Sequence, residues 1–214
     1  MTFQPTYFCP PGVFNRYLVM KRDGQTELVE VAATMPEGLA YRDGVLSSAE
    51  EAELTAHLTN LEFRPFQFRG VEARRRVVYF GWRYDFAGQR LQAAEPMPDF
   101  LLPLRERAAD LAGIAPETFS HLLINEYAAG TPIGWHRDRA VFDDVVGVSL
   151  GAPCGLRFRR LAGVGWERLS VPLSPRSAYL LRGAARNEWE HSIAPVRDLR
   201  YSITFRSLNI PIGP

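Results

Sequence analysis

The sequence predicts an α+β fold that is mainly β, with helices in the first half supporting a double-sheet β-core in the second. Two observations predict it. Helix signals fall within residues 47–113, whereas short runs rich in β-branched and aromatic residues follow one another from residue 120 onward. Glycine, proline or charged turns separate these runs, a spacing typical of a sandwich or barrel-like double sheet.

The elements before the β-core are expected to be a hairpin and two helices. A turn-like "KRDGQ" separates "FNRYLVM" from "ELVEVAA", which indicates a hairpin in an otherwise irregular extension. A helix is expected to begin near Ser47, which can form a capping box with Glu50. A second helix is expected within residues 98–113, ending at Gly113.

The predicted strands of the core follow closely along the chain. They are "HLLINEY", "VVGVSL", "GLRFRR", "ERLSVPL", "RSAYLLRG", "HSIAPV" and "RYSITFRSL". No linker-like stretch divides them from the helices, and about 100 to 200 residues is an ordinary length for one domain. We therefore expect an extension over residues 1–40 and a single domain over residues 41–214.

Composition places the chain among globular proteins that do not enter membranes. The hydrophobic share of 46% and the charged share of 23% are ordinary for that class. There is no long apolar run, and the N-terminus lacks the basic start and apolar core of a signal peptide. Cys9 and Cys154 are too few for a disulfide scaffold or a cysteine zinc cluster, so we expect unpaired thiols and a cytoplasmic location.

The charge of the chain is balanced, at +1 overall, so net charge neither favours nor excludes a nucleic-acid partner. Lys21 is the only lysine among 25 basic residues, a bias that genome composition explains as easily as function does. Arginine's planar fork suits phosphates and carboxylates. Two clusters are therefore candidate contacts for an anionic partner: Arg74, Arg75 and Arg76, and Arg157, Arg159 and Arg160.

The stretch "GWHRDRAVFDD" contains a candidate metal site. Alternate side chains of an extended segment point to one side, so His136 and Asp138 can face a common point. His191, at the start of a predicted strand, is the candidate third ligand, and two histidines with one carboxylate form the facial triad of non-haem Fe(II) oxygenases. The alternative is that the pair is polar surface. His57 is expected to be a surface or boundary residue of the first helix, and His121 is expected to be structural rather than a ligand.

The last predicted strand has one polar face and one apolar face. The polar face carries Arg200, Ser202, Thr204 and Arg206. Two arginines beside hydroxyls would bind a dicarboxylate, because guanidinium pairs bidentately with carboxylate. Asn125 and Tyr127, two positions apart on another strand, offer an amide and a phenol to the same ligand. The alternative is an exposed strand face with solvated arginines.

In their order along the chain, the motifs N-x-Y, H-x-D, H and R-x-x-x-x-x-R resemble those of the AlkB family of 2-oxoglutarate- and Fe(II)-dependent dioxygenases. The resemblance is strongest in "INEYAAGTPIGWHRDRAVFDDVVGVSLG" and "EWEHSIAPVRDLRYSITFRSL", reaches back more weakly through "VVYFGWRYDF" to the helix near residue 47, and leaves the first forty residues uncovered. It implies a double-stranded β-helix, or jelly roll. It also implies that His136, Asp138 and His191 bind Fe(II), and that Asn125, Tyr127, Arg200, Ser202 and Arg206 bind 2-oxoglutarate.

The activity implied by the resemblance is oxidative dealkylation. With Fe(II) as cofactor, the enzyme would use 2-oxoglutarate and O2 to hydroxylate a substrate C–H bond and would release succinate and carbon dioxide. No catalytic residue is expected beyond the metal ligands. An N-methyl carbon would then leave as formaldehyde. At Ser202 the bacterial prototype of the family has an asparagine, a departure that leaves the arginine pair intact.

The substrate expected from the resemblance is an alkylated base in single-stranded DNA or RNA, bound by a monomer away from membranes. Such a base is held between aromatic faces. Trp82 and Tyr84 are the candidates, since Tyr84 matches a family tyrosine that lies against the base, whereas Phe86 is expected in the core. Arg74, Arg75 and Arg76 would meet phosphates.

Recognition of a particular base is left open by the sequence. Ala140 stands where the prototype has an acidic residue against the base, and Asp143 or Asp144 is a candidate substitute. A dioxygenase acting on a protein side chain or small molecule is therefore the first alternative. The second is a non-catalytic β-core domain that binds nucleic acid or protein, which the intact triad and arginine pair disfavour.

Overall fold

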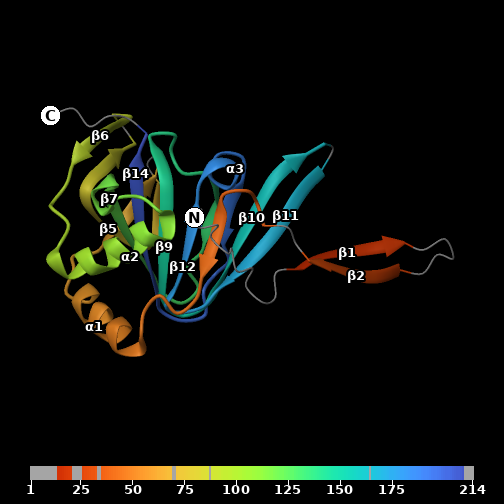
Figure 1. The fold of residues 1–214 in the computed structure, drawn as a ribbon, viewed down its shortest axis with the longest axis horizontal. Helices are drawn as coiled ribbons and strands as arrows, with labels where there is room; N and C mark the ends of the chain where they lie inside the picture. Colours follow the sequence, from red (N-terminus) through yellow and green to blue (C-terminus); the bar gives the residue numbers. More distant parts are fainter. Residues whose placement is uncertain are drawn as a thin grey trace, which may run out of the picture.

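The computed structural model describes residues 14–20, 26–32, 35–68, 71–86, 88–163 and 165–209. The main body consists of two antiparallel β-sheets packed face to face, with helices on the outer side of the larger sheet (Figure 1). The predicted mainly-β fold is confirmed. β1 (Phe14–Met20) and β2 (Thr26–Ala32) pair with each other as an antiparallel hairpin. The "KRDGQ" turn and Cys9 lie outside the described residues.

The larger sheet contains most of the strands. In spatial order these are β3 (Leu39–Arg42), β12 (Ser177–Leu181), β9 (Phe142–Gly151), β14 (Arg200–Leu208), β7 (Phe119–Tyr127), β5 (Val71–Asp85) and β4 (Arg64–Phe68), with β6 (Arg90–Ala93) paired to β5. β14 is central, between β9 and β7. The predicted polar strand is therefore held by neighbours on both sides, which fixes the direction of every side chain along it.

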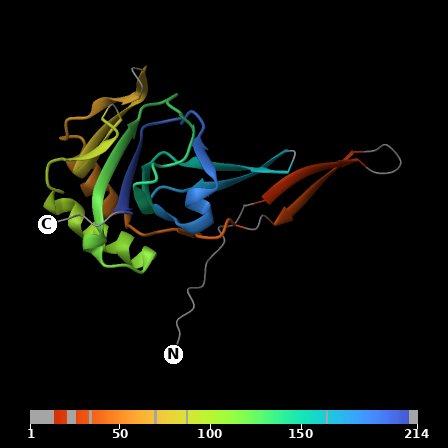
Figure 2. The same cartoon turned by 90° about the horizontal axis from the view of Figure 1, so that it is seen from above.

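The smaller sheet covers the inner face of the larger one. Its strands, in spatial order, are β11 (Gly165–Leu173), β10 (Cys154–Ala162), β13 (Glu190–Ile193) and β8 (Ile133–His136). The view from above separates the two layers (Figure 2). Between them lies an apolar cluster that includes Leu156, Phe158 and Trp189. The cluster fills one part of the space between the sheets, and a cavity lined partly by polar side chains occupies another.

Both predicted helices are present on the outer side of the larger sheet. α1 (Ser48–Leu58) begins with the expected capping box, in which Ser47 and Glu50 satisfy each other's backbone N–H groups. α2 (Leu102–Ala112) ends at Gly113, whose φ of 67° is the left-handed conformation that glycine adopts without strain. Leu58 and Leu104 pack with Ile203 of β14 in the outer core. The helices thus support the back of the strand that carries the polar face. Short helical turns η1 (Asp99–Leu101), η2 (Pro116–Thr118) and α3 (Gly183–Asn187) complete the fold.

The first half of the chain contributes more to the sheet than the sequence indicates. β4, β5 and β6 extend the larger sheet beyond β7, so the region between the two helices is not only a support. Gly81 permits this, because a Cβ there would lie 2.0 Å from the carbonyl oxygen of Ser120. β3 begins at Leu39 and pairs with β12, while the boundary of the extension at residue 40 stays a prediction. None of the helices in the described ranges has the length and hydropathy to span a membrane.

Candidate active site

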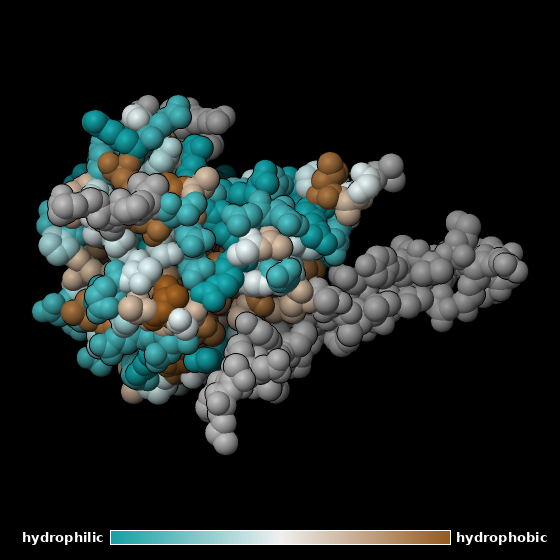
Figure 3. All heavy atoms as spheres, turned by 45° about the horizontal axis from the view of Figure 1, so that its top comes forward, coloured by the Kyte–Doolittle hydropathy of each residue, from teal (hydrophilic) through white to brown (hydrophobic). Residues whose placement is uncertain are grey.

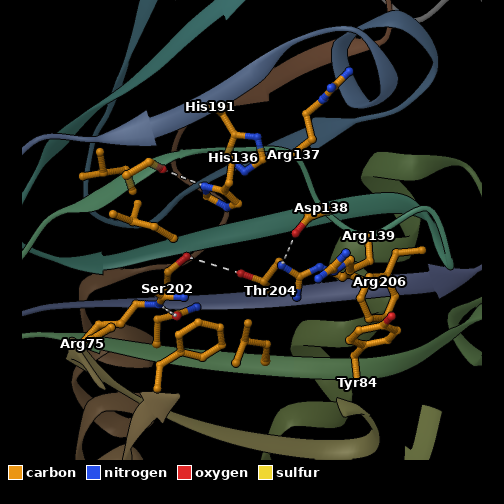
Figure 4. Close-up of a pocket in the computed structure, with 18 of the residues that line it drawn as sticks. Arg75, Tyr84, His136, Arg137, Asp138, Arg139, His191, Ser202, Thr204 and Arg206 are labelled. Atoms are coloured by element: carbon orange, nitrogen blue, oxygen red, sulfur yellow. Dashed lines mark hydrogen bonds and ion pairs between the residues drawn. The ribbon is translucent and has the colours of Figure 1, made fainter. Parts of the chain in front are cut away.

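A cavity of about 630 Å³ lies between the two sheets. Its deep part is bordered by β7 and β14 of the larger sheet and by β8 and β13 of the smaller one, and its mouth by β5 and the loop after β8 (Figure 4). Four predicted site positions line the deep part together: Asn125, Tyr127, Ser202 and Arg206. Because these strands are hydrogen-bonded in fixed register, the side chains that face the cavity are set by the fold rather than by loop conformation.

The three candidate metal ligands converge on one point of this cavity. His136 ends β8, Asp138 follows in the loop, and His191 lies on β13 directly opposite His136. One ligand atom from each residue lies within 4.8 Å of the others. In Figure 4 the two imidazoles face each other, and Arg137 points away from them. The spacing of the three atoms suits one divalent cation with positions left for other ligands.

Neighbouring groups orient these ligands. His136 Nδ1 lies 2.9 Å from the carbonyl oxygen of Gly134, which can only accept, so Nδ1 carries the proton and Nε2 keeps its lone pair. Asp138 Oδ1 accepts a hydrogen bond of 3.0 Å from Arg206 Nη2. Asp138 Oδ2 is buried with no hydrogen-bond partner among the described residues. An unpaired buried carboxylate oxygen beside two imidazoles is what a metal cation would satisfy.

The electrostatics of the triad favour the protonation states that bind a metal. Burial lowers the pKa of His136, and burial together with the nearby His136 lowers the pKa of His191 to about 3, so both rings are neutral at pH 7. For Asp138, burial acts to raise the pKa, but the surrounding positive charge, first that of Arg206, outweighs it and the pKa lies below its usual range. The site therefore offers two neutral nitrogens and one ionised carboxylate.

The polar face of β14 is buried. Arg200 is 0% and Arg206 7% exposed, so the alternative of solvated arginines is wrong. Arg200 Nε donates to Ser149 Oγ over 3.2 Å, while Nη1 and Nη2 have no hydrogen-bond partner among the described residues. Arg206 likewise has Nε and Nη1 without a partner. Arg206 lines the cavity, where a guanidinium buried in this way fits a bound carboxylate, whereas Arg200 is not among the lining residues.

The remaining predicted co-substrate residues lie between these two arginines. Asn125 of β7 is directly opposite Ser202 of β14. The Asn125 side-chain oxygen accepts from Arg75 Nε over 3.1 Å. The Arg200 guanidinium lies 5.1 Å from the ring of Tyr127. Tyr127 lines the cavity, whereas Arg200 does not. Burial raises the pKa of Tyr127, which therefore stays a neutral hydrogen-bond donor.

At the mouth, the structure separates the predicted substrate residues. Tyr84 lines the cavity, and so does Phe86, which the sequence places in the core. Trp82 is not among the lining residues. Of the arginine triplet only Arg75 lines the cavity, stacked 3.8 Å above the ring of Phe66. Arg74 does not line it, and Arg76 forms a salt bridge of 2.6 Å with Glu126.

Three further residues of the site carried no sequence signal for a role. Arg186 is only 4% exposed and its Nη2 donates to the carbonyl oxygens of Arg139 and Phe142, which fixes the loop that contains Asp138. The guanidinium of Arg139 lies over the rings of Tyr84 and Phe86. Tyr179, buried on β12, closes the deep part. Each acts through a contact between distant segments, which residue spacing alone does not reveal.

Of the other singled-out residues that the structure describes, only His121 lines the cavity. His57 is stacked on Phe100 at the surface of α1, and Cys154 is a free thiol. His121 is buried against Phe142. The second arginine cluster forms ion pairs: Arg159 with Glu190, and Arg160 with Glu167 and Glu188.

Residues 38–206 match the sequence profile of the 2OG-Fe(II) oxygenase superfamily. The chain belongs to this superfamily. The match covers the whole of both sheets except the end of β14, including the triad and the arginine-bearing face. A 2OG-Fe(II) oxygenase uses Fe(II), 2-oxoglutarate and O2, and the unpaired buried oxygen and guanidinium groups described above fit these ligands. The protein is therefore a 2-oxoglutarate-dependent dioxygenase.

Two curated proteins are similar in sequence to this chain. The chain is 26% identical over 210 residues to the alkylated DNA repair protein ALKBH8 homolog of Arabidopsis thaliana, with 83% of this chain and 59% of that protein covered. It is 27% identical over 157 residues to the uncharacterized protein L905 of Acanthamoeba polyphaga mimivirus, covering 64% of this chain and 72% of the viral protein. The resemblance to the AlkB family is confirmed, although this chain spans little more than half the length of the Arabidopsis relative.

Solved structures of this superfamily share the fold. The structure of OsALKBH1 superposes with a TM-score of 0.65 at 15% identity, over 82% of this chain and 100% of that one. A 2OG-Fe(II) oxygenase family oxidoreductase from Burkholderia pseudomallei gives a TM-score of 0.55 at 18% identity, over 80% and 85%. The expected jelly-roll architecture is thereby confirmed.

Proposed function

We propose that this dioxygenase removes alkyl groups from the bases of single-stranded nucleic acid. In this proposal His136, Asp138 and His191 hold the iron, and Arg200 and Arg206 hold the carboxylates of 2-oxoglutarate, assisted by Asn125, Tyr127 and Ser202. The observation that carries it is one continuous cavity with unpaired ligand groups at its deep end and aromatic rings at its mouth. When bound, iron and 2-oxoglutarate supply the oxidation of a substrate C–H bond by O2.

The protein's own residues supply positions rather than proton transfers. Asp138 is held by Arg206 and its loop by Arg186, so the open side of the triad has a fixed direction. In the hydroxylated N-methyl group the hydroxyl would lose its proton to water and the N–C bond would break, releasing formaldehyde, while the base nitrogen takes up a proton from water. No further acid or base is needed for that step, since an N-hydroxymethyl group breaks down spontaneously.

Aromatic and basic side chains at the mouth support nucleic acid as the substrate. Tyr84 and Phe86 lie in edge contact and line the cavity, offering a surface on which an extruded base can stack. On the opposite side, Arg159 is sandwiched 4.5 Å from the ring of Trp135 and 4.3 Å from that of Trp166. Trp166 is 43% exposed, so a ladder of rings and guanidinium groups runs from the cavity along the β10–β11 hairpin. Such ladders suit flanking nucleotides of a single strand.

On the side of the molecule shown in Figure 3, the described residues form no large apolar patch that would favour a protein substrate. That face is mostly hydrophilic, with hydrophobic side chains in small separate groups, one of them toward the end of the β10–β11 hairpin. Leu161 on this hairpin is 69% exposed. A protein or small-molecule substrate is the competing proposal, and it would use the same deep cavity.

Formaldehyde release separates these proposals. Purified protein with Fe(II), 2-oxoglutarate and O2 is incubated with methylated single-stranded DNA, methylated RNA and methylated peptides of matched length. We expect formaldehyde and succinate in equal amounts from a nucleic acid, and neither from a His136→Ala variant. Succinate without formaldehyde from any nucleic acid would reject base dealkylation while leaving the dioxygenase intact.

A further inference from the structure

The ionisable groups around the cavity have an uneven charge. Among the described residues that line it, four are arginines, Arg75, Arg137, Arg139 and Arg206, and one, Asp138, is a carboxylate. The carboxylate already accepts from Arg206 and borders the proposed metal position. A divalent cation and a 2-oxoglutarate dianion would cancel each other in charge. The loaded cavity would therefore keep a formal excess of three positive charges toward its substrate.

Arg139 brings this charge to the place where a base would lie. Its guanidinium carbon is 5.3 Å from the ring centre of Tyr84 and 5.1 Å from that of Phe86. Figure 4 shows Arg139 in the same part of the cavity as Tyr84. A base that stacks on these rings must move the guanidinium to its edge, where arginine can only donate hydrogen bonds. The edge favoured there is one with carbonyl or ring-nitrogen acceptors.

No carboxylate of the described mouth is placed to offset Arg139. Ala140 has none, and neither Asp143 nor Asp144 lines the cavity. Asp144 is committed elsewhere, because both of its oxygens accept from Arg182. The two candidate substitutes for an acid at position 140 are thus not in position to contact a base in the cavity.

We propose that the cavity selects electrically neutral alkylated bases that present carbonyl oxygens, and discriminates against bases that alkylation has made cationic. This inference rests on the proposed base dealkylation and names its substrate class. 3-Methylthymine and 1-methylguanine are neutral at pH 7 and carry a carbonyl beside the methylated nitrogen. 3-Methylcytosine and 1-methyladenine are cations with an exocyclic amine there. Like charges a few ångströms apart at a half-buried site repel, and amine donors cannot pair with a guanidinium donor.

The test compares two single-stranded DNA oligonucleotides that differ at one base, 3-methylthymine or 3-methylcytosine. Both place the methyl group on the same ring nitrogen, so charge, the neighbouring edge and the C5 methyl group of thymine are the variables, and 3-methyluracil serves as the control that lacks the C5 methyl. We expect kcat/KM for formaldehyde release to favour 3-methylthymine by about tenfold or more. Equal rates, or faster release from 3-methylcytosine, would overturn the inference.

Variants locate the source of the selectivity. Arg139→Gln removes the charge and keeps amide hydrogen bonds, and we expect it to reduce the ratio to within about threefold, whereas Arg139→Lys should retain it. Ala140→Asp should move the ratio toward the cation. Arg83→Gln is the matched control, since Arg83 pairs with Gln92 and does not line the cavity. An unchanged ratio in Arg139→Gln would remove Arg139 from the explanation and overturn the inference as stated.

Binding distinguishes failure of the inference from failure of the proposed function. Fluorescence anisotropy of the same two oligonucleotides, with 2-oxoglutarate and Mn(II) in place of iron, keeps the charge of the loaded cavity and needs no turnover. Tighter binding of the 3-methylthymine strand without formaldehyde release would support the selection of neutral bases and reject dealkylation. Formaldehyde release with tighter binding of the 3-methylcytosine strand would support dealkylation and reject the selection.

Discussion

The deep end of the cavity and its mouth are built in different ways. The deep end consists of side chains from hydrogen-bonded neighbouring strands, as with Asn125 opposite Ser202 and His191 opposite His136. The mouth consists of the far end of β5 and a loop, where Arg139 rests on aromatic rings without an ion pair in the described structure. Paired strands fix directions, whereas a stacked arginine can be displaced. The reaction is therefore specified by the rigid part and the substrate by the adaptable part.

The largest expected effect is at the triad. Asp138→Ala removes the carboxylate that completes the proposed site and leaves Arg206 buried without its partner. We expect succinate formation to fall by on the order of 100-fold or more, together with loss of Mn(II) binding measured by calorimetry. Asp143→Ala is the control, because Asp143 is exposed and does not line the cavity. Undiminished Mn(II) binding in Asp138→Ala would contradict the assignment of the ligand.

The second-largest effect is expected at Arg200, where one substitution should weaken 2-oxoglutarate binding and stabilise the ligand-free protein. Arg200→Met should raise the KM for 2-oxoglutarate by about 10- to 100-fold, because a charge-assisted contact with the carboxylate is lost. The same change should stabilise the ligand-free protein by on the order of 1 kcal/mol, since two buried nitrogens without partners disappear. Urea unfolding without 2-oxoglutarate measures this, with the exposed Arg64→Met as control. A destabilised ligand-free variant would show that the contacts of Arg200 with Ser149 and Tyr127 outweigh the cost of its unpaired nitrogens, which contradicts this prediction.

A smaller effect is expected at the mouth. Tyr84→Ala should raise the KM for a methylated oligonucleotide about tenfold, since stacking of one base on an aromatic ring contributes roughly 1–3 kcal/mol. Trp82→Ala should change it less, because Trp82 does not line the cavity. Succinate formed without nucleic acid should stay the same in both. If the Trp82 variant shows the larger defect, the base stacks further along β5, toward Gly81.

The smallest effect concerns His121, at the boundary between the two regions. Burial lowers the pKa of His121 well below its ordinary value of 6.5. The unfolded chain then takes up a proton below about pH 6.5 that the folded protein excludes, so stability is fully present above that pH and falls as the pH decreases. His121→Gln should reduce this slope by at most about 1.4 kcal/mol per pH unit. Urea unfolding from pH 7 to pH 5 checks it, with the exposed His57→Gln as control, and an unchanged slope contradicts it.

The difference between the two regions also explains what the sequence could predict. The alternation of β14 placed Arg200 and Arg206 on one face, and both are buried there because a central strand leaves no choice of side. The capping box at Ser47 is equally local. The same alternation put Trp82 on the face of β5 that carries Tyr84, yet only Tyr84 lines the cavity, because a shared face does not decide how far along the strand the cavity reaches. Arg186 and Arg139 escaped notice because their roles depend on contacts across long stretches of chain.

The hydrogen bond from Arg206 to Asp138 has a thermodynamic consequence. Without metal, the Asp138 carboxylate 3.0 Å away largely neutralises the guanidinium charge of Arg206. A cation bound at Asp138 takes over that neutralisation, which leaves Arg206 more attractive to an incoming carboxylate. Linkage is reciprocal, so a dicarboxylate must strengthen cation binding by the same factor. The two ligands should therefore bind with positive cooperativity, and a scarce metal would be retained best when 2-oxoglutarate is abundant.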